Sequence, residues 1–118
     1  MEWEVLISDE YEKWFNQLPQ KHKMAIATDL EVLKTVGPLL GRPYADQVKG
    51  ANIKNLKELR TKIAGCVYRS LYAFDPERVA VILCGGNKKG KDQDKFYTKL
   101  ISHAEVIFEK HLKSINTK

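Results

Sequence analysis

Three strand-like runs follow one another closely in the second half of this 118-residue chain. Apolar, β-branched and aromatic residues dominate about 56–61, 66–74 and 78–84. The last two runs are separated by residues 75–78, where Pro76 takes the second position expected of a β-turn. Links this short join antiparallel neighbours, because a parallel connection needs a dozen or more residues. The sequence therefore predicts a largely antiparallel sheet.

Two short helices are predicted ahead of these strands. Ser8 can cap the first helix, whose opening turn is acidic and therefore complements the helix dipole. Pro19 ends that helix and can begin the second, which stops at Gly37-Pro38. Apolar residues recur at helical spacing in both segments: Tyr11, Trp14, Phe15 and Leu18, then Ile26, Leu30 and Leu33. A tight turn between them predicts an N-terminal helical hairpin.

The remaining segments complete the predicted fold. Alternation around Trp3, Val5 and Ile7 indicates a short first strand, residues 38–55 read as a long loop, and an amphipathic helix runs to about residue 113. The expected architecture is a single α+β domain over residues 1–118, with the helical hairpin packed on a four-stranded, largely antiparallel, twisted sheet and a C-terminal helix.

Charge is distributed unevenly along the chain. The net charge is +5, but residues 1–37 carry four basic and seven acidic side chains, whereas 38–87 and 88–118 each carry eight basic and four acidic ones. The later two-thirds would attract a polyanion such as RNA, DNA or an acidic protein. The acidic start and the lack of a long apolar run indicate a cytoplasmic protein without membrane contact.

The two cysteines indicate neither a metal site nor a redox site. Cys66 and Cys84 have no C-x-x-C spacing and no flanking histidine cluster. Both lie in apolar runs, so we expect reduced, buried thiols.

Several short motifs, in order, resemble those of the RelE/ParE superfamily of bacterial toxins, in its HigB-like branch. These are Gly41-Arg42-Pro43, the segment from Lys54 to Arg60, Tyr68-Arg69 followed by Ala73-Phe74-Asp75-Pro76, Gly85-Gly86-Asn87-Lys88, and Glu109-Lys110-His111-Leu112. The resemblance covers nearly the whole chain and implies a RelE-like fold.

The resemblance also implies a function. It suggests the toxin of a type II toxin–antitoxin system, acting as a ribosome-dependent endoribonuclease (an mRNA interferase) that needs no metal or other cofactor and inhibits translation. The expected partners are a cognate antitoxin of helix-turn-helix type, the ribosome and mRNA. Two alternatives remain: a ParE-like toxin that acts by binding DNA gyrase, and an inactive toxin that only binds its antitoxin.

The resemblance suggests catalytic residues on the strands and after them. Metal-free RNA cleavage needs an activated 2′-OH, stabilisation of the phosphate's extra charge, and a proton for the leaving 5′-oxygen. Arg69 matches a phosphate-binding arginine, Lys89 roughly matches a second cationic position beside Lys88, and Tyr97 lies near a catalytic tyrosine. Each also has a plain structural reading: a salt-bridged arginine, a solvated basic turn and a core tyrosine.

Three further cations are candidate RNA-binding residues: Lys54, Lys57 and Arg60. For Arg60, an ion pair with Glu58 on the same strand face is an equally good reading. The chain departs from the family pattern at Asn87, where an aspartate is common and where an amide cannot carry a proton. Its three histidines are expected on helices and not on strands, which leaves the general base unidentified.

Overall fold

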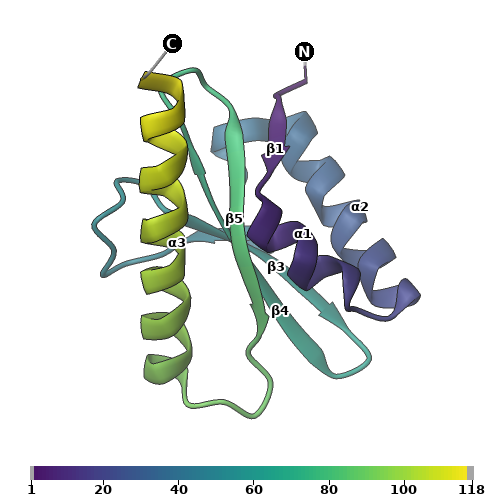
Figure 1. The fold of residues 1–118 in the computed structure, drawn as a ribbon. Coiled ribbons are helices and arrows are strands. Elements are labelled where there is room, and N and C mark those ends of the chain that lie inside the picture. The colour runs from purple at the N-terminus through teal and green to yellow at the C-terminus, as the bar shows by residue number, and fades with distance from the viewer. Residues whose placement is uncertain (1, 117–118) are drawn as a thin grey trace.

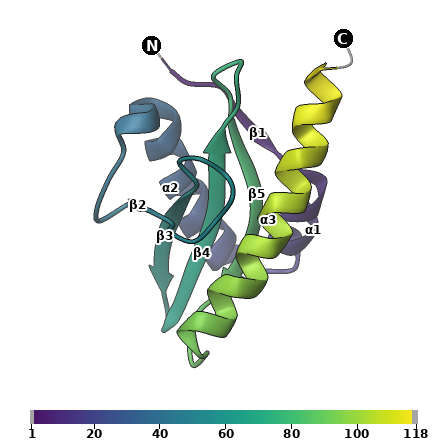
Figure 2. The same cartoon turned by 90° about the vertical axis from the view of Figure 1, so that its left-hand side faces the viewer.

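The computed structural model describes residues 2–116 and contains a five-stranded sheet with helices on both faces. Figure 1 shows α3 crossing one face of the sheet, with α1 and α2 on the opposite side, and Figure 2 gives the view turned by 90°. The strand order is β1-β5-β4-β3-β2. The elements are β1 (Val5–Ile7), α1 (Asp9–Asn16), α2 (Gln20–Val36), a 3-10 turn (Gly37–Leu39), β2 (Ala45–Gln47), β3 (Lys57–Ile63), β4 (Cys66–Phe74), β5 (Ala80–Asn87) and α3 (Gln93–Asn116).

The predicted antiparallel arrangement is confirmed for the three long strands. β3 pairs with β4 and β4 pairs with β5, both antiparallel, whereas β1 pairs with β5 in parallel. In this register Arg60 lies opposite Arg69, and Arg69 lies opposite Gly86. Arg60, Arg69 and Gly86 therefore lie side by side across β3, β4 and β5.

The sheet has one strand more than the sequence predicted. Residues 45–47, expected to be part of a long loop, form β2 and pair antiparallel with residues 57–59 of β3. Three residues between turn-forming neighbours are too few to display a strand periodicity, so the pairing comes from tertiary packing. Ala45 is fully buried there, and the Arg60 amide donates to the Tyr44 carbonyl at 2.8 Å.

Two apolar cores lie on opposite faces of the sheet, because successive strand residues point to opposite sides. Beneath α1 and α2 the buried residues include Tyr11, Leu33, Leu59, Tyr72 and Ile82. Beneath α3 they include Leu71, Leu83, Phe96, Leu100 and Phe108. Burying side chains of this size stabilises the fold by about 1.5–3 kcal/mol each before entropy is counted.

The predicted cap of α1 is confirmed and also attaches the helix to the sheet. Ser8 Oγ accepts a hydrogen bond from the Tyr11 amide at 3.0 Å and donates one to the Leu83 carbonyl at 2.7 Å. The Tyr11 hydroxyl lies 2.8 Å from Ser70 Oγ on β4, and burial raises its pKa to about 12. The helical hairpin is therefore fixed to β4 and β5 by buried polar contacts.

The cysteines match the sequence prediction in part. Both are free thiols. Cys84 is buried with its Sγ 3.3 Å from the Leu100 carbonyl, and burial raises its pKa to about 12. Cys66, at the start of β4, is partly exposed because it lies beside the β3–β4 turn. In the part of the chain that is described, no helix is both long and apolar enough to cross a membrane.

Replacing Gly85 by alanine is expected to destabilise the protein by about 1–3 kcal/mol, as overpacking does. A Cβ atom at this position would lie 2.5 Å from the indole ring of Trp14, which packs α1 against β5. Urea unfolding followed by circular dichroism measures the change as a lower midpoint at constant slope. Gly41→Ala is the matched control, since a Cβ there meets nothing within 4 Å. Equal midpoints for the two variants would contradict this packing.

The contact between Asp75 and His111 is expected to make stability depend on acid pH. His111 Nε2 lies 2.7 Å from Asp75 Oδ2 and ties the end of α3 to the β4–β5 turn. Burial alone would raise the pKa of Asp75, but bonds from His111 and from the Val79 and Glu77 amides outweigh it and lower the pKa. A depressed carboxyl pKa gives stability that is present above the unfolded value of about 3.9 and is lost as pH falls through the folded value.

His111→Ala should therefore cost about 1–3 kcal/mol at pH 7, because it leaves a buried carboxylate with fewer donors. The cost should begin to shrink as pH falls below about 4 and should vanish only below the lowered folded pKa of Asp75, where the carboxyl is neutral in both states. Urea unfolding at several pH values measures this. A pH-independent difference between the two proteins would rule out the assigned role of Asp75.

Candidate catalytic cluster between the sheet and the last helix

The candidate residues from β3 and β4 lie on the face of the sheet that α3 covers. Glu58 and Arg60 are two apart on β3, and Arg69 and Leu71 are two apart on β4, so all four share one face. Leu71 packs in the core under α3, which identifies that face. Tyr97 reaches the same place from the first turns of α3.

Glu58 is the centre of this cluster. The Tyr97 hydroxyl donates to Glu58 Oε1 at 2.5 Å. Glu58 Oε2 lies 3.6 Å from Nε of Arg69 and 3.7 Å from Nε of Arg60. The residue is only 6% exposed, so one carboxylate joins three candidate side chains in a largely dry environment. The Arg60–Glu58 pairing considered in the sequence analysis is present.

Arg69 is almost completely enclosed. It is 1% exposed, Nε donates to the Tyr97 hydroxyl at 3.3 Å, and Nη1 donates to the Tyr68 carbonyl at 3.2 Å. Gly86 stands opposite it on β5, and a Cβ there would come within 3.0 Å of the Phe96 ring. A buried arginine requires a partner for its charge, and Glu58 supplies it.

Lys88 and Lys89 diverge after β5. The Lys88 Nζ lies 5.6 Å from the centre of the Tyr97 ring, while the exposed Lys89 side chain reaches toward Gly65 in the β3–β4 turn. Asn87 Oδ1 accepts hydrogen bonds from the Val67 and Lys89 amides and so shapes the turn that follows β5. Of the lysine pair, Lys88 is the one that joins the cluster.

The electrostatics of the cluster shift two pKa values. Burial lowers the pKa of Lys88, the positive charge of Arg69 lowers it further, and Glu58 acts in the opposite direction. Burial raises the pKa of Tyr97, and its hydrogen bond to Glu58 adds to the rise, while Arg69 opposes it. Lys88 therefore gives up its proton more readily than a free lysine, and Tyr97 holds its proton more firmly than a free tyrosine.

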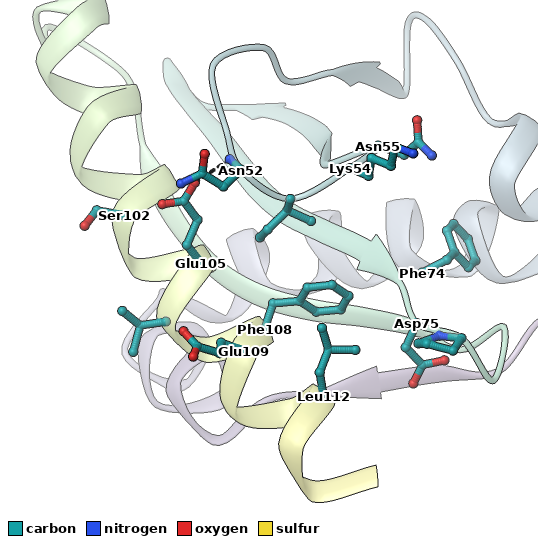
Figure 3. Close-up of a pocket in the computed structure, with 13 residues that line it drawn as sticks. Asn52, Lys54, Asn55, Phe74, Asp75, Ser102, Glu105, Phe108, Glu109 and Leu112 are labelled. Carbon is teal, nitrogen blue, oxygen red and sulfur yellow. Dashed lines mark hydrogen bonds between the residues drawn. The ribbon is translucent and has the colours of Figure 1, made fainter. Parts of the chain in front are cut away.

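The structure places Lys54 and Lys57 away from the cluster. Lys57 Nζ donates to the Pro38 and Leu40 carbonyls at 2.6 and 3.2 Å, and its position on β3 alternates with that of Glu58, so it lies on the opposite face. Lys54 lines a cavity of about 780 Å³ beside the C-terminal half of α3. Figure 3 shows Phe108 and Leu112 directed into that cavity, with Glu105 reaching toward Asn52. The carboxylates that line this cavity make it a poor site for a phosphate.

Glu58 is the functional candidate that the sequence analysis did not select. It was considered only as a structural partner of Arg60. A signal was available: Glu-x-Arg on a strand puts both side chains on one face, and the next strand puts Arg69 directly across from Arg60. The three histidines lie on α2 and α3, as predicted from the sequence.

The arrangement of helices and strands is that of the RelE toxins. Over 78% of this chain it matches a chain of the archaeal RelE–RelB complex from Pyrococcus horikoshii OT3, covering all of that chain, with a TM-score of 0.56 and 20% identity. It also matches a mutant of the Escherichia coli toxin RelE in the free state, with a TM-score of 0.58 and 15% identity over 86% of this chain and 99% of that one. These similarities establish the fold.

Sequence comparison then identifies the family. Residues 13–109 match the family described as Phage derived protein Gp49-like (DUF891), so the chain belongs to it. Two Mycobacterium tuberculosis (strain ATCC 25618 / H37Rv) relatives, named as toxins HigB2 and HigB3, are each 40% identical, over 100 and 86 residues. These alignments cover 84% and 73% of this chain. The chain spans about half of HigB2 (49%) and 74% of HigB3.

Replacing Glu58 by alanine is expected to destabilise the protein by about 3 kcal/mol, because it leaves the buried Arg69 without its counter-charge. Glu58→Gln should cost less, since its amide oxygen still accepts from Tyr97. Adding Arg69→Met to Glu58→Ala should recover part of the loss, because no unpaired charge remains. Urea unfolding of wild type, Glu58→Ala, Arg69→Met and the double variant forms a double-mutant cycle. Additive losses would show that the two side chains are not coupled.

Proposed function

We propose that this chain is the toxin of a type II toxin–antitoxin system and that it cleaves mRNA on the ribosome without a metal ion. The observation that carries the proposal is the meeting of Glu58, Arg69, Lys88 and Tyr97 at one end of α3. A carboxylate, a phenol and two cations can supply the base, the acid and the charge stabilisation that cleavage by an RNA 2′-OH requires. The relatives named as HigB toxins support the same class.

In the proposed mechanism the ribose 2′-OH attacks the adjacent phosphorus. Its proton passes to the Tyr97 oxygen while the phenol proton passes to Glu58, which already accepts that hydrogen bond. Arg69 and Lys88 stabilise the added negative charge on the phosphate oxygens. The bond from phosphorus to the 5′-oxygen breaks, and Lys88 gives the leaving oxygen its proton. The products carry a 2′,3′-cyclic phosphate and a 5′-hydroxyl.

Two features of the cluster support dependence on the ribosome. Arg69 is 1% exposed and faces Glu58, so the free chain exposes little of the Arg69 charge to free RNA. A message held by the ribosome would supply the phosphate and the orientation that free RNA lacks. The 2′-OH nucleophile confines the reaction to RNA.

The partners follow from this proposal. The toxin would work in the cytoplasm, where ribosomes are, and would be held inactive by a cognate antitoxin of the helix-turn-helix type. The excess of basic residues after position 37 suits an acidic antitoxin segment. Neither a toxin that binds gyrase nor an inactive toxin would need proton carriers and cations to meet in one cluster.

Arg69→Ala is expected to lower the cleavage rate about 5- to 150-fold, equivalent to about 1–3 kcal/mol of lost transition-state stabilisation. Lys88→Ala and Tyr97→Phe should also slow cleavage, because each removes a proton carrier. Primer extension on a defined message, with and without translating ribosomes, measures codon-positioned cuts. An intact message in every wild-type reaction would exclude the nuclease and direct attention to a gyrase supercoiling assay and to growth arrest on expression.

Two controls keep this result clear. Lys113→Ala removes one positive charge from an exposed i,i+4 pair with Glu109 and should cut at the wild-type rate. Arg69 is buried, so circular dichroism must show that the Arg69 variant is folded before its rate is interpreted. Lys88→Ala changes a less enclosed side chain and tests the same cluster with less structural risk.

A further inference from the structure

A second cavity lies at the free edge of β3, beside the catalytic cluster. It has a volume of about 460 Å³ and is lined by Asp29, Arg42, Pro43, Tyr44, Arg60 and Lys62. Its volume falls within the roughly 300–1,000 Å³ range of small-ligand sites. Arg42 and Pro43 of the Gly41-Arg42-Pro43 motif line it, and the proposed chemistry does not use that motif.

The cavity exists because β2 is short. β2 pairs only with residues 57–59 of β3, so residues 60–63 at that edge have no strand beside them in the described sheet. The chain before β2 turns across this edge, where the Tyr44 carbonyl accepts from the Arg60 amide. Tyr44 is left 43% exposed at the cavity wall, although large apolar rings usually gain from burial.

Arg60 connects the cavity to the cluster. Its Nε is 3.7 Å from Glu58 Oε2, and its side chain also lines the cavity. A nucleotide chain whose scissile phosphate lies at the cluster would therefore have a neighbouring unit within reach of the cavity. Arg60 would contact the backbone between the two positions.

The chemistry of the lining fits a nucleotide better than a bare anion. Arg42 contacts Asp46 through Nε at 3.0 Å and Nη2 at 2.7 Å, and this pair is solvent-exposed, so its guanidinium can exchange that partner for a phosphate at small cost. Lys62 is exposed and adds positive charge. Asp29 accepts a bond from Thr61 Oγ1 at 2.6 Å and puts a carboxylate in the wall, which suits the amino group of a base and repels a free phosphate.

We propose that this cavity binds one nucleotide of single-stranded RNA next to the cleaved bond, with its base stacked on Tyr44 and its backbone held by Arg42, Arg60 and Lys62. This inference rests on the proposed function, because it assigns the cavity to the same RNA substrate. Stacking on an aromatic ring and phosphate contacts from basic side chains are the usual means of holding a single strand. The site would influence which codon positions are cut.

The first test measures binding of a short 2′-O-methyl RNA, which has no free 2′-OH and cannot be cleaved, by fluorescence anisotropy. Tyr44→Ala should weaken binding about tenfold, since base stacking on an aromatic ring contributes at this level. Tyr44→Phe should bind within about twofold of wild type because it keeps the ring. Lys62→Ala should reduce the slope of log K against log salt by about 0.7, the value for one phosphate contact on a single strand. Lys113→Ala is the charge-matched control and should leave the slope unchanged.

Wild-type affinity and slope in both Tyr44→Ala and Lys62→Ala would overturn the proposal, as would a wild-type protein that does not bind the oligonucleotide. If these substitutions weaken binding of an antitoxin and leave RNA binding intact, the cavity is a protein contact and the proposal is wrong.

Ribosome-dependent cleavage separates failure of this inference from failure of the proposed function. If Tyr44→Ala cuts the message at the same positions and rate as wild type, the cavity does not bind the substrate and the nuclease proposal stands. If wild type leaves the message intact while oligonucleotide binding still depends on Tyr44, the protein is not a nuclease and the cavity is still an RNA-binding site.

Discussion

The cluster depends on a single carboxylate. Glu58 is the acceptor for Tyr97 and the nearest counter-charge of Arg69, and both contacts are buried under α3. An arginine that is 1% exposed is tolerated in this sheet only because an anion is close to it. The same carboxylate also fixes the first turns of α3 against β3. The proposed chemistry and the docking of the last helix therefore share one interaction.

This arrangement explains why a site rich in cations can remain stable while empty. Arg60, Arg69 and Lys88 lie close together, and their mutual repulsion contributes to the lowered pKa of Lys88, after burial. Glu58 offsets part of that repulsion. A substrate phosphate would bring a second negative group into the cluster, so binding would redistribute the contacts of Arg69 and Lys88. Burial would strengthen each of those contacts relative to the same contacts in water.

The fold was predictable from the sequence wherever the pattern was long. The three long strands, the helical hairpin with its Ser8 cap and the last helix all follow from periodicity and turn chemistry. β2 was not predictable, since its three residues form a strand only because the edge of β3 offers hydrogen bonds to it. Arg69 and Tyr97 were identified through the family resemblance, and their meeting depends on a register of strand and helix that sequence spacing does not specify.

Lys57 and Glu58 are neighbours on β3, and their side chains lie on opposite faces of the sheet. Neighbouring residues in an extended chain point to opposite sides, so a run of basic residues does not form one surface. Lys57 donates hydrogen bonds to the Pro38 and Leu40 carbonyls at the end of the 3-10 turn, on the face opposite Glu58. The positive charge in and beside the cluster comes instead from Arg69 on β4, Lys88 after β5, Arg60 and Lys62 on β3, and Arg42 before β2. A polyanion leaving the cluster along the β3 edge would therefore meet Arg60, Arg42 and Lys62, and the short length of β2 is what leaves that edge open.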